Sequence, residues 1–403
     1  MTKPLSHIRV VDLTRILAGP WAAQLLADLG AEVIKIERPG EGDDTRGWGP
    51  PFITNADGSE GDAAYFLSAN RGKKSVAIDI SRAEGQNLVR QIALKSDVLI
   101  ENFKLGGLKK YGLDYDSLAA ANPRLIYCSI TGFGQDGPYA HRAGYDFMIQ
   151  GMSGLMSVTG EADGMPLKVG VAVSDLFTGL YGANAIQAAL IDRERTGRGT
   201  HIDMSLLDTQ IAALANQNSN YLVSGAAPGR LGNAHPNIVP YQAFETADGH
   251  IILAIGNNRQ FAAFCKVAGL GDLPDDPRFA GNKERVAHRE ECVALVAAAM
   301  KQKTTSEWVG VLEEVSVPCG PINSIDNVFA DPQVAHRGLR LDTRREDGTG
   351  TPTVANPIRM DGKQMISERA VPALGDSTRD VLRDALGMDD DQIETLSDTG
   401  TIG

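Results

Sequence analysis

The sequence predicts an α/β protein built on a parallel sheet. Segments of strand and helix character alternate through its N-terminal half, and the first three of them form a strand–helix–strand unit. Strands joined through a helix pair in parallel with a right-handed crossover. The 403 residues are enough for two domains, and 42% hydrophobic with 22% charged residues is ordinary for a globular chain.

The first unit has clear bounds. A strand is predicted at His7–Thr14, a helix at Trp21–Leu29 with Gly30 as its stop, and a second strand at Ala31–Ile36. The unit looks like the first half of a nucleotide-binding sheet. Its turn contains Gly19 but no G-x-G-x-x-G loop, which speaks against a nicotinamide dinucleotide site.

The alternation continues after a segment rich in Gly, Asp and Pro, Gly40–Gly61, which is predicted to be a long loop. Further strands are predicted at Ser75–Ile80, Asp97–Ile100 and Leu125–Ile130, with a helix at Glu84–Lys95. Ligands of such sheets bind beyond the carboxyl ends of the strands. Arg38, Asn102, Phe103 and the loop Gly132–Gly137 lie at such ends.

The next stretch, Val169–Leu190, joins a short apolar run to a helical pattern. Val169–Val173 is predicted as a strand or buried extended segment, and Asp175 falls at the start of the helix. Free N–H groups and the helix dipole favour a carboxylate there. Asp175 is therefore either a helix N-cap, which is the commoner case, or a carboxylate nucleophile beside a glycine-lined surface.

The C-terminal half mixes a hairpin with helices. The predicted elements are a strand at His201–Met204, a helix at Ser205–Val223, a hairpin at Tyr241–Ile255, helices at Arg259–Leu270, Arg289–Met300 and Ser306–Val315, an extended return at Val317–Ile322, a strand at Thr353–Met360, and a helix at Asp376–Leu386 before a polar tail. The small-residue segment Gly225–Gly229 is a candidate domain boundary.

Composition excludes several classes of function. The net charge of −12 argues against binding to nucleic acid or to an anionic membrane. No signal peptide or membrane span is expected, and the four cysteines lack a C-x-x-C motif, so we expect a cytoplasmic protein with reduced thiols. The histidines form no metal-binding pattern, and no metal is predicted.

Several motifs together resemble the class III CoA-transferases, the family of formyl-CoA transferase. They are D-L-T-R-I-L-A-G-P at Asp12–Pro20, L-G-A-E-V-I-K-I-E-R-P at Leu29–Pro39, E-N-F-K at Glu101–Lys104, R-A-G-Y-D at Arg142–Asp146, T-G-R-G-T at Thr196–Thr200 and P-C-G-P-I at Pro318–Ile322. Their joint order and spacing make the likeness specific, and it covers nearly the whole chain.

The resemblance implies an architecture. A large Rossmann-like domain would be built from both chain ends, residues 1–204 and 323–403, with a helix and linker at 205–229 and a smaller inserted α+β domain at 230–322. It also implies an interlocked homodimer.

The resemblance also implies a site for coenzyme A as substrate, with no tightly bound cofactor. Asp175 would be the nucleophile. The CoA-binding positions would be Leu17, Ala18, Arg38, Ile78, Ile80, Asn102, Phe103, Lys110, Tyr145 and Asp146, with Lys104 and Arg142 as further candidates. Plainer interpretations remain for some of them: Ile78 and Ile80 as core, Lys110 as a solvated charge, Asp146 as a cap and Arg38 as half of a surface ion pair.

The expected reaction is CoA transfer between carboxylic acids through an aspartyl anhydride and an aspartyl-CoA thioester. The loop Leu231–Pro240 has Gly232 where formyl-CoA transferase has a run of glycines, and its A-H-P-N looks like relatives that handle succinyl-CoA and other dicarboxylic acids. The main alternative is an α-methylacyl-CoA racemase, although that enzyme uses a His where this chain has Tyr145. An NADP-dependent oxidoreductase and a CoA-binding module without chemistry are the remaining alternatives.

Overall fold

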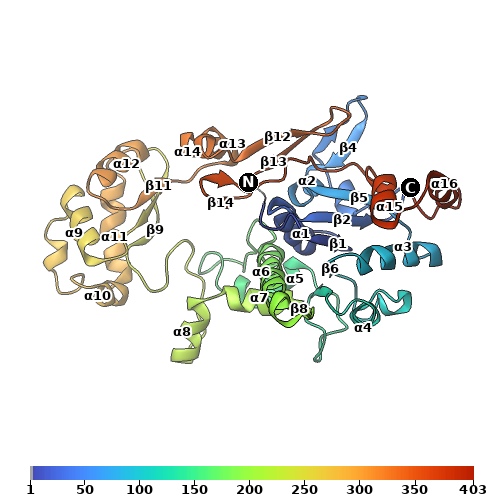
Figure 1. Cartoon of the computed structure of the whole chain (residues 1–403). Coiled ribbons are helices and arrows are strands. Elements are labelled where there is room, and N and C mark those ends of the chain that lie inside the picture. Colours follow the sequence, from blue (N-terminus) through green and yellow to red (C-terminus); the bar gives the residue numbers. More distant parts are fainter. Residues whose placement is uncertain (1–2) are drawn as a thin grey trace. The chain divides into compact units, whose positions relative to one another are not determined.

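A six-stranded parallel sheet forms the centre of the fold in this computed structural model, which describes residues 3–403 (Figure 1). Its strands are β1 (Arg9–Asp12), β2 (Glu32–Glu37), β5 (Lys73–Ala77), β6 (Val98–Glu101), β7 (Ile126–Thr131) and β8 (His201–Ser205). They lie in the order β5-β2-β1-β6-β7-β8, and every pair is parallel. The α/β prediction is confirmed.

The strand order reverses beside β1. The chain runs outward from β1 through β2 to β5, and then returns to lay β6 on the other side of β1. Such a reversal opens a crevice at the carboxyl ends of the two central strands. Leu13 and the turn that follows it leave β1 there, and Asn102 and Phe103 leave β6 there.

Helices cover both faces of this sheet because neighbouring strand residues point to opposite sides. Val10 belongs to the core shared with α1 (Ala18–Asp28) and α6 (Val173–Thr196), whereas Val11 belongs to the core shared with α3 (Ala83–Leu94) and α15 (Thr378–Leu386). Between β6 and α6 the chain also forms η2 (Lys109–Tyr111), α4 (Tyr115–Ala119), α5 (Asp146–Met152) and η3 (Leu155–Ser157).

The described chain forms two compact units. Of the described residues, the first unit comprises 3–155, 168–224 and 335–403, and the second comprises 156–167 and 225–334. The expected small domain covers residues 230–322. The second unit also contains residues 156–167, starts its main part at residue 225 and extends to residue 334. It holds an antiparallel sheet of β9 (Tyr241–Glu245), β10 (His250–Ala254) and β11 (Cys319–Pro321), and the helices α9 (Asn258–Val267), η4 (Leu273–Asp275), α10 (Asn282–Ala287), α11 (Arg289–Met300) and α12 (Thr305–Glu314).

Several local predictions need correction. The segment predicted as a loop at 40–61 contains η1 (Asp44–Gly47), β3 (Phe52–Thr54) and the start of β4 (Glu60–Ala63), which leads into α2 (Ala64–Ala69). Val169–Val173 is neither a strand nor a buried extended segment: no strand lies there, Val171 is 57% exposed, and α6 already begins at Val173. The helix predicted at 205–223 is two helices, α7 (Leu206–Ala213) and α8 (Asn216–Ser224), separated at Ala215, whose φ is +44°.

The C-terminal part also differs from the prediction. It contains α13 (Ile325–Ala330), α14 (Pro332–His336), β12 (Arg340–Arg344), β13 (Gly350–Val354), β14 (Arg359–Met360) and β15 (Lys363–Gln364). The predicted strand 353–360 is therefore split between β13 and β14. The polar tail holds a further helix, α16 (Asp390–Asp398), which starts in a capping box of Asp389 and Gln392.

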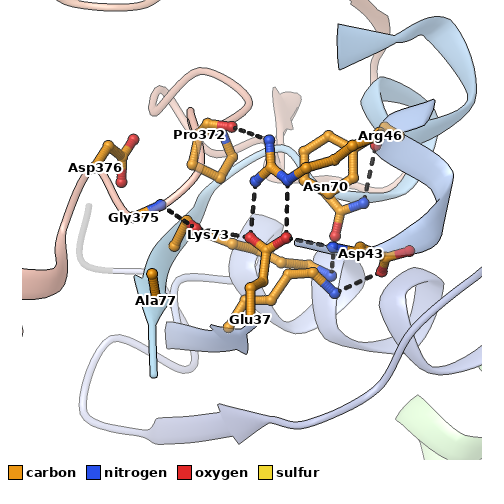
Figure 2. Close-up of polar contacts among 12 residues, drawn as sticks. Glu37, Asp43, Arg46, Asn70, Lys73, Ala77, Pro372, Gly375 and Asp376 are labelled. Atoms are coloured by element: carbon orange, nitrogen blue, oxygen red, sulfur yellow. Dashed lines mark hydrogen bonds and ion pairs between the residues drawn. The ribbon is translucent and has the colours of Figure 1, made fainter. Parts of the chain in front are cut away.

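A buried ionic network ties the sheet to the C-terminal segment. Figure 2 shows Glu37 facing Arg46, whose Nη2 lies 2.7 Å from Glu37 Oε1, and Arg46 also donates to Pro372 O at 3.3 Å. Ser75 Oγ donates to Glu37 at 2.7 Å and accepts from Gly375 N–H at 2.9 Å. Buried charges are costly unless paired and hydrogen-bonded, and each of these groups has partners.

Candidate active site

Asp175 lies in the first turn of α6 but is not its cap. The N-cap position is Ala172, which makes no side-chain hydrogen bond, so the cap interpretation of Asp175 is wrong. The capping oxygen comes from another segment: Asp146 Oδ1 accepts the Ser174 N–H at 2.9 Å. Asp175 is therefore free to face a cavity of about 440 Å³, which it lines together with Leu17, Ala18 and Tyr145.

The electrostatic surroundings of Asp175 favour its neutral form. Burial is the main cause and the negative charge of Asp146 adds to it, so that the pKa of Asp175 rises to about 7. Asp146 is itself held by Gln150, whose Nε2 donates to Asp146 Oδ2 at 2.7 Å. Asp146 thus caps the helix, while Asp175 changes its charge near neutral pH.

Close packing of two helices brings Asp175 to the crevice. Gly179 lies one turn after Asp175 in α6, and a Cβ at Gly179 would approach Ala18 O to 2.6 Å. Glycine therefore allows the N-terminal end of α1 to lie against α6. As a consequence, Ala18 and Asp175 share one cavity although they are remote in the sequence.

The turn between β1 and α1 is strained and firmly held. Ile16 has a φ of +74°, which is unfavourable for a β-branched residue. Asn102 clamps the residue before it, accepting from Arg15 N–H at 3.0 Å and donating to Arg15 O at 2.8 Å. Asp43 Oδ1 accepts the Ile16 N–H at 3.3 Å, and Lys35 Nζ donates to Thr14 O at 2.8 Å.

Lys35 and Asp43 form the fixed support of that turn. Their side chains are fully buried and 2.9 Å apart. Burial alone would raise the pKa of Asp43, but the charge and hydrogen bond of Lys35 outweigh it and hold that pKa at about 2. Asp43 therefore stays ionised and keeps its hold on Ile16.

A second cavity of about 470 Å³ contains the other predicted positions. It is lined by Arg38, Ile78, Ile80 and Phe103. Arg38 pairs with Glu41 at 2.9 Å and its side chain is 68% exposed, so the ion pair is weak and the guanidinium is accessible. Both cavities share Arg15, Phe103 and Tyr111.

The structure brings most predicted residues together at these two cavities. Leu17, Ala18, Asn102, Phe103, Lys110, Tyr145 and Asp175 line the first, as do the additional candidates Lys104 and Arg142. Asp146 lines neither cavity and acts on Asp175 through its charge.

Sequence reasoning missed an aromatic pair near Asp175. Tyr65 and Trp48 meet edge to face with their ring centroids 5.4 Å apart. Burial first, and then the charges of Asp175 and Asp146, raise the pKa of Tyr65 to about 12. Both residues belong to the region 40–65, most of which was predicted as a loop, and nothing in its pattern signals a neighbour on α6.

Comparison with known proteins places this site in a family. Residues 5–378 match the family model described as CoA-transferase family III. The chain belongs to CoA-transferase family III. The enzymes of this family use CoA thioesters as substrates, so the CoA-transferase prediction is confirmed.

Similar proteins span the whole length of this CoA-transferase. It is 55% identical to the succinate–glutarate CoA-transferase of Agrobacterium fabrum, over 99% of this chain and 98% of that protein. It is 45% identical to the succinyl-CoA:glutarate CoA-transferase of Mus musculus, over 99% of this chain and 90% of the mouse protein. The crystal structure of a CAIB/BAIF family protein from Brucella suis is 52% identical, covers 96% of this chain and 100% of its own, and superposes with a TM-score of 0.84. Within residues 3–403 of this CoA-transferase, no helix has the length and apolar character needed to cross a membrane.

Proposed function

We propose that this enzyme transfers CoA from succinyl-CoA to a dicarboxylic acid such as glutarate, with Asp175 as the nucleophile. The single observation that carries the nucleophile is the Asp175 carboxyl facing the first cavity beside Leu17 and Ala18. The substrates are supported by the relatives, because the A. fabrum and mouse enzymes carry succinate or succinyl-CoA and glutarate in their names.

The chemistry requires the ionised form of Asp175. Its carboxylate attacks the thioester carbonyl, forming a mixed anhydride and releasing CoA thiolate. The thiolate then attacks the Asp175 carbonyl, which forms an aspartyl-CoA thioester and releases the donor acid. The acceptor acid attacks that thioester and the two steps run in reverse, so the energy of the thioester is retained.

The two cavities offer one path for coenzyme A. The adenine end would lie against Ile78 and Ile80 near the accessible guanidinium of Arg38, and the pantetheine arm would pass Phe103 toward Leu17 and Ala18. The support for this placement is that Phe103 and Tyr111 line both cavities, and Arg15 joins them as a cation that suits phosphate.

We also propose the homodimer and the two-domain division, with the second compact unit as the small domain. Several large apolar side chains of the first unit are exposed in the single chain. Phe177, Leu180, Tyr181 and Ile191 share one face of α6, and Ile191 is 76% exposed. A second copy of the chain would cover this face, so light scattering should give twice the mass of one chain.

The function is tested by transfer assays and by trapping the intermediate. Purified enzyme is incubated with succinyl-CoA and a panel of carboxylic acids, and mass spectrometry identifies each new CoA ester. Without acceptor, the intact protein should gain the mass of a covalent adduct that maps to Asp175. Asp175→Asn should lose transfer and adduct, whereas Asp208→Asn should keep both, because Asp208 is an exposed first-turn residue of α7 that lines neither cavity.

Two outcomes would contradict the proposal. Substantial transfer by Asp175→Asn would exclude Asp175 as the nucleophile. Exchange of the α-proton of a 2-methylacyl-CoA with solvent, without any acceptor acid, would instead favour the racemase alternative.

A further inference from the structure

A buried carboxyl is hydrogen-bonded to the backbone of a residue that lines both cavities. Glu101 is the last residue of β6 and is 6% exposed. Its Oε2 accepts the Phe103 N–H at 2.7 Å. Phe103 lines both large cavities and also a third one of about 180 Å³, to which Glu101 contributes. Glu101 therefore fixes the backbone of a residue that the cavities share.

Neighbouring strands extend this contact into a series of adjacent polar side chains. Ser129 stands opposite Glu101 on β7, close enough for its hydroxyl to favour the ionised form of the Glu101 carboxyl and lower its pKa. Ser129 Oγ also lies 2.9 Å from Nε2 of His201, the first residue of β8. The His201 ring stacks on Tyr115 with centroids 4.9 Å apart. Each of β6, β7 and β8 thus supplies one polar side chain to the series.

No ion pair compensates the charge of Glu101 among residues 3–403. The titratable groups around it are Lys104 and Lys109 after β6, Asp114, Tyr115 and Asp116 at α4, Tyr127 and Cys128 on β7, and His201 and Asp203 on β8. Burial raises the pKa of Glu101 to about 7, although the hydrogen bonds from Ser129 and Phe103 N–H oppose this rise.

The segment held by Glu101 is coupled to the rest of the site. Asn102 lies between Glu101 and Phe103, and its side chain clamps both polar backbone atoms of Arg15. Arg15 precedes the strained Ile16 and the cavity residue Leu17. A change in the hold on Phe103 therefore acts on the CoA path at Phe103 itself and, through Asn102, on the turn beside Asp175.

We propose that Glu101 is a positioning residue whose ionised carboxyl fixes the Asn102–Phe103 segment for CoA, so that CoA affinity falls when Glu101 takes up a proton. An ionised acceptor holds an N–H more strongly than a neutral one. In the ionised state Ser129 donates to Glu101 and accepts from His201 Nε2–H. The proposal rests on the proposed function, because it assumes that CoA occupies these cavities.

The test is the pH dependence of CoA binding, measured by calorimetric titration between pH 6 and 8.5. All variants carry Asp175→Asn, so the nucleophile itself does not titrate. The dissociation constant should rise about fivefold from pH 8 to pH 6 beyond any change that the phosphates of CoA cause. In Glu101→Gln the amide oxygen accepts the Phe103 N–H at every pH. Because this acceptor is always neutral, the variant should lose the excess pH dependence and bind CoA at pH 8 about fivefold more weakly than the parent, as the parent does at pH 6.

A second variant separates positioning from a merely structural role. Ser129→Ala removes a donor that favours the ionised carboxyl, so the midpoint of the affinity change should move to higher pH. Exposed Glu84 on α3 gives the matched control, and Glu84→Gln should leave the pH profile unchanged.

Unchanged pH dependence in Glu101→Gln would overturn the inference while leaving the proposed function intact. If Glu101→Gln does not fold, Ser129→Ala decides, and an unmoved midpoint overturns it. Absence of CoA binding at every pH would overturn both.

Discussion

Asp175 and Asp146 show how one carboxylate sets the chemistry of another. The Asp146 carboxylate accepts hydrogen bonds from the Ser174 N–H and from Gln150 Nε2, and these bonds fix its position near Asp175. Its charge and the burial of Asp175 together raise the pKa of Asp175. In the proposed mechanism this environment would favour attack by Asp175, because a poorly solvated carboxylate is a stronger nucleophile than one in water.

The pH dependence of transfer follows from this pair. In the proposed mechanism the reaction needs the ionised form of Asp175, whose pKa is about 7 in the free enzyme, so kcat/KM for succinyl-CoA should rise with pH and level off above that value. At pH 6 it should be roughly tenfold below the plateau. Stopped assays across pH 5.5–8.5 measure this rising limb of the pH–rate profile.

Asp146→Asn provides the matched variant. Asparagine can still accept the Ser174 N–H, but it removes the neighbouring negative charge, so the rising limb should move to lower pH. A limb that stays in place would show that burial alone, or another group, controls the ionisation.

At the scale of elements, the packing of α1 against α6 decides whether the site exists. Gly179→Ala would place a Cβ 2.6 Å from Ala18 O, and the two helices would have to separate. We expect a loss of about 1–3 kcal/mol in the free energy of unfolding, together with a loss of transfer activity. Denaturant titration and the transfer assay measure the two effects.

A helical glycine in open surroundings serves as the control. Gly310 in α12 would have nothing within 4 Å of an added Cβ. Gly310→Ala should therefore keep activity and gain up to about 1 kcal/mol, since alanine favours helix. Equal effects at both glycines would contradict a specific role for the close approach at Gly179.

At the scale of the whole molecule, buried ion pairs join an early segment of the chain, residues 37–62, to the C-terminal segment. Arg46 pairs with Glu37 and with Asp62 at 2.9 Å, and it donates to Pro372 O, which lies in the C-terminal part of the chain. Arg345 joins the same Asp62. The C-terminal segment is therefore an integral part of the first compact unit.

Removing one member of this network should lower the free energy of unfolding much more than breaking a surface ion pair. Arg46→Leu would leave Glu37 buried with its main cationic partner missing, and we expect a loss of about 3–5 kcal/mol in unfolding free energy. Arg379→Ala, which breaks an exposed pair with Glu394, should cost less than about 1 kcal/mol. Similar losses in chemical denaturation would show that burial of the network contributes little.

Local patterns in the sequence predicted most of the sheet and the elements around it. The strands near Arg9, Glu32 and Ile126 follow from runs of apolar residues, and α3 and α11 follow from helical periodicity. The elements that the sequence did not predict also have physical explanations. The hairpin of β3 and β4 is rich in turn formers, and the capped α16 lies in an acidic tail with few apolar residues.

The sequence by itself determined the order along the chain of the six strands of the main sheet, the carboxyl-end location of Arg38, Asn102 and Phe103, and the presence of Asp175 in a first helical turn. Such features depend on neighbours along the chain. Only the tertiary structure decided that Asp146 caps α6, that Tyr65 lies near Asp175, and that Glu101, Ser129 and His201 share one series. These relations join residues far apart in sequence. They depend on desolvation, which arises only when remote segments pack together and exclude water.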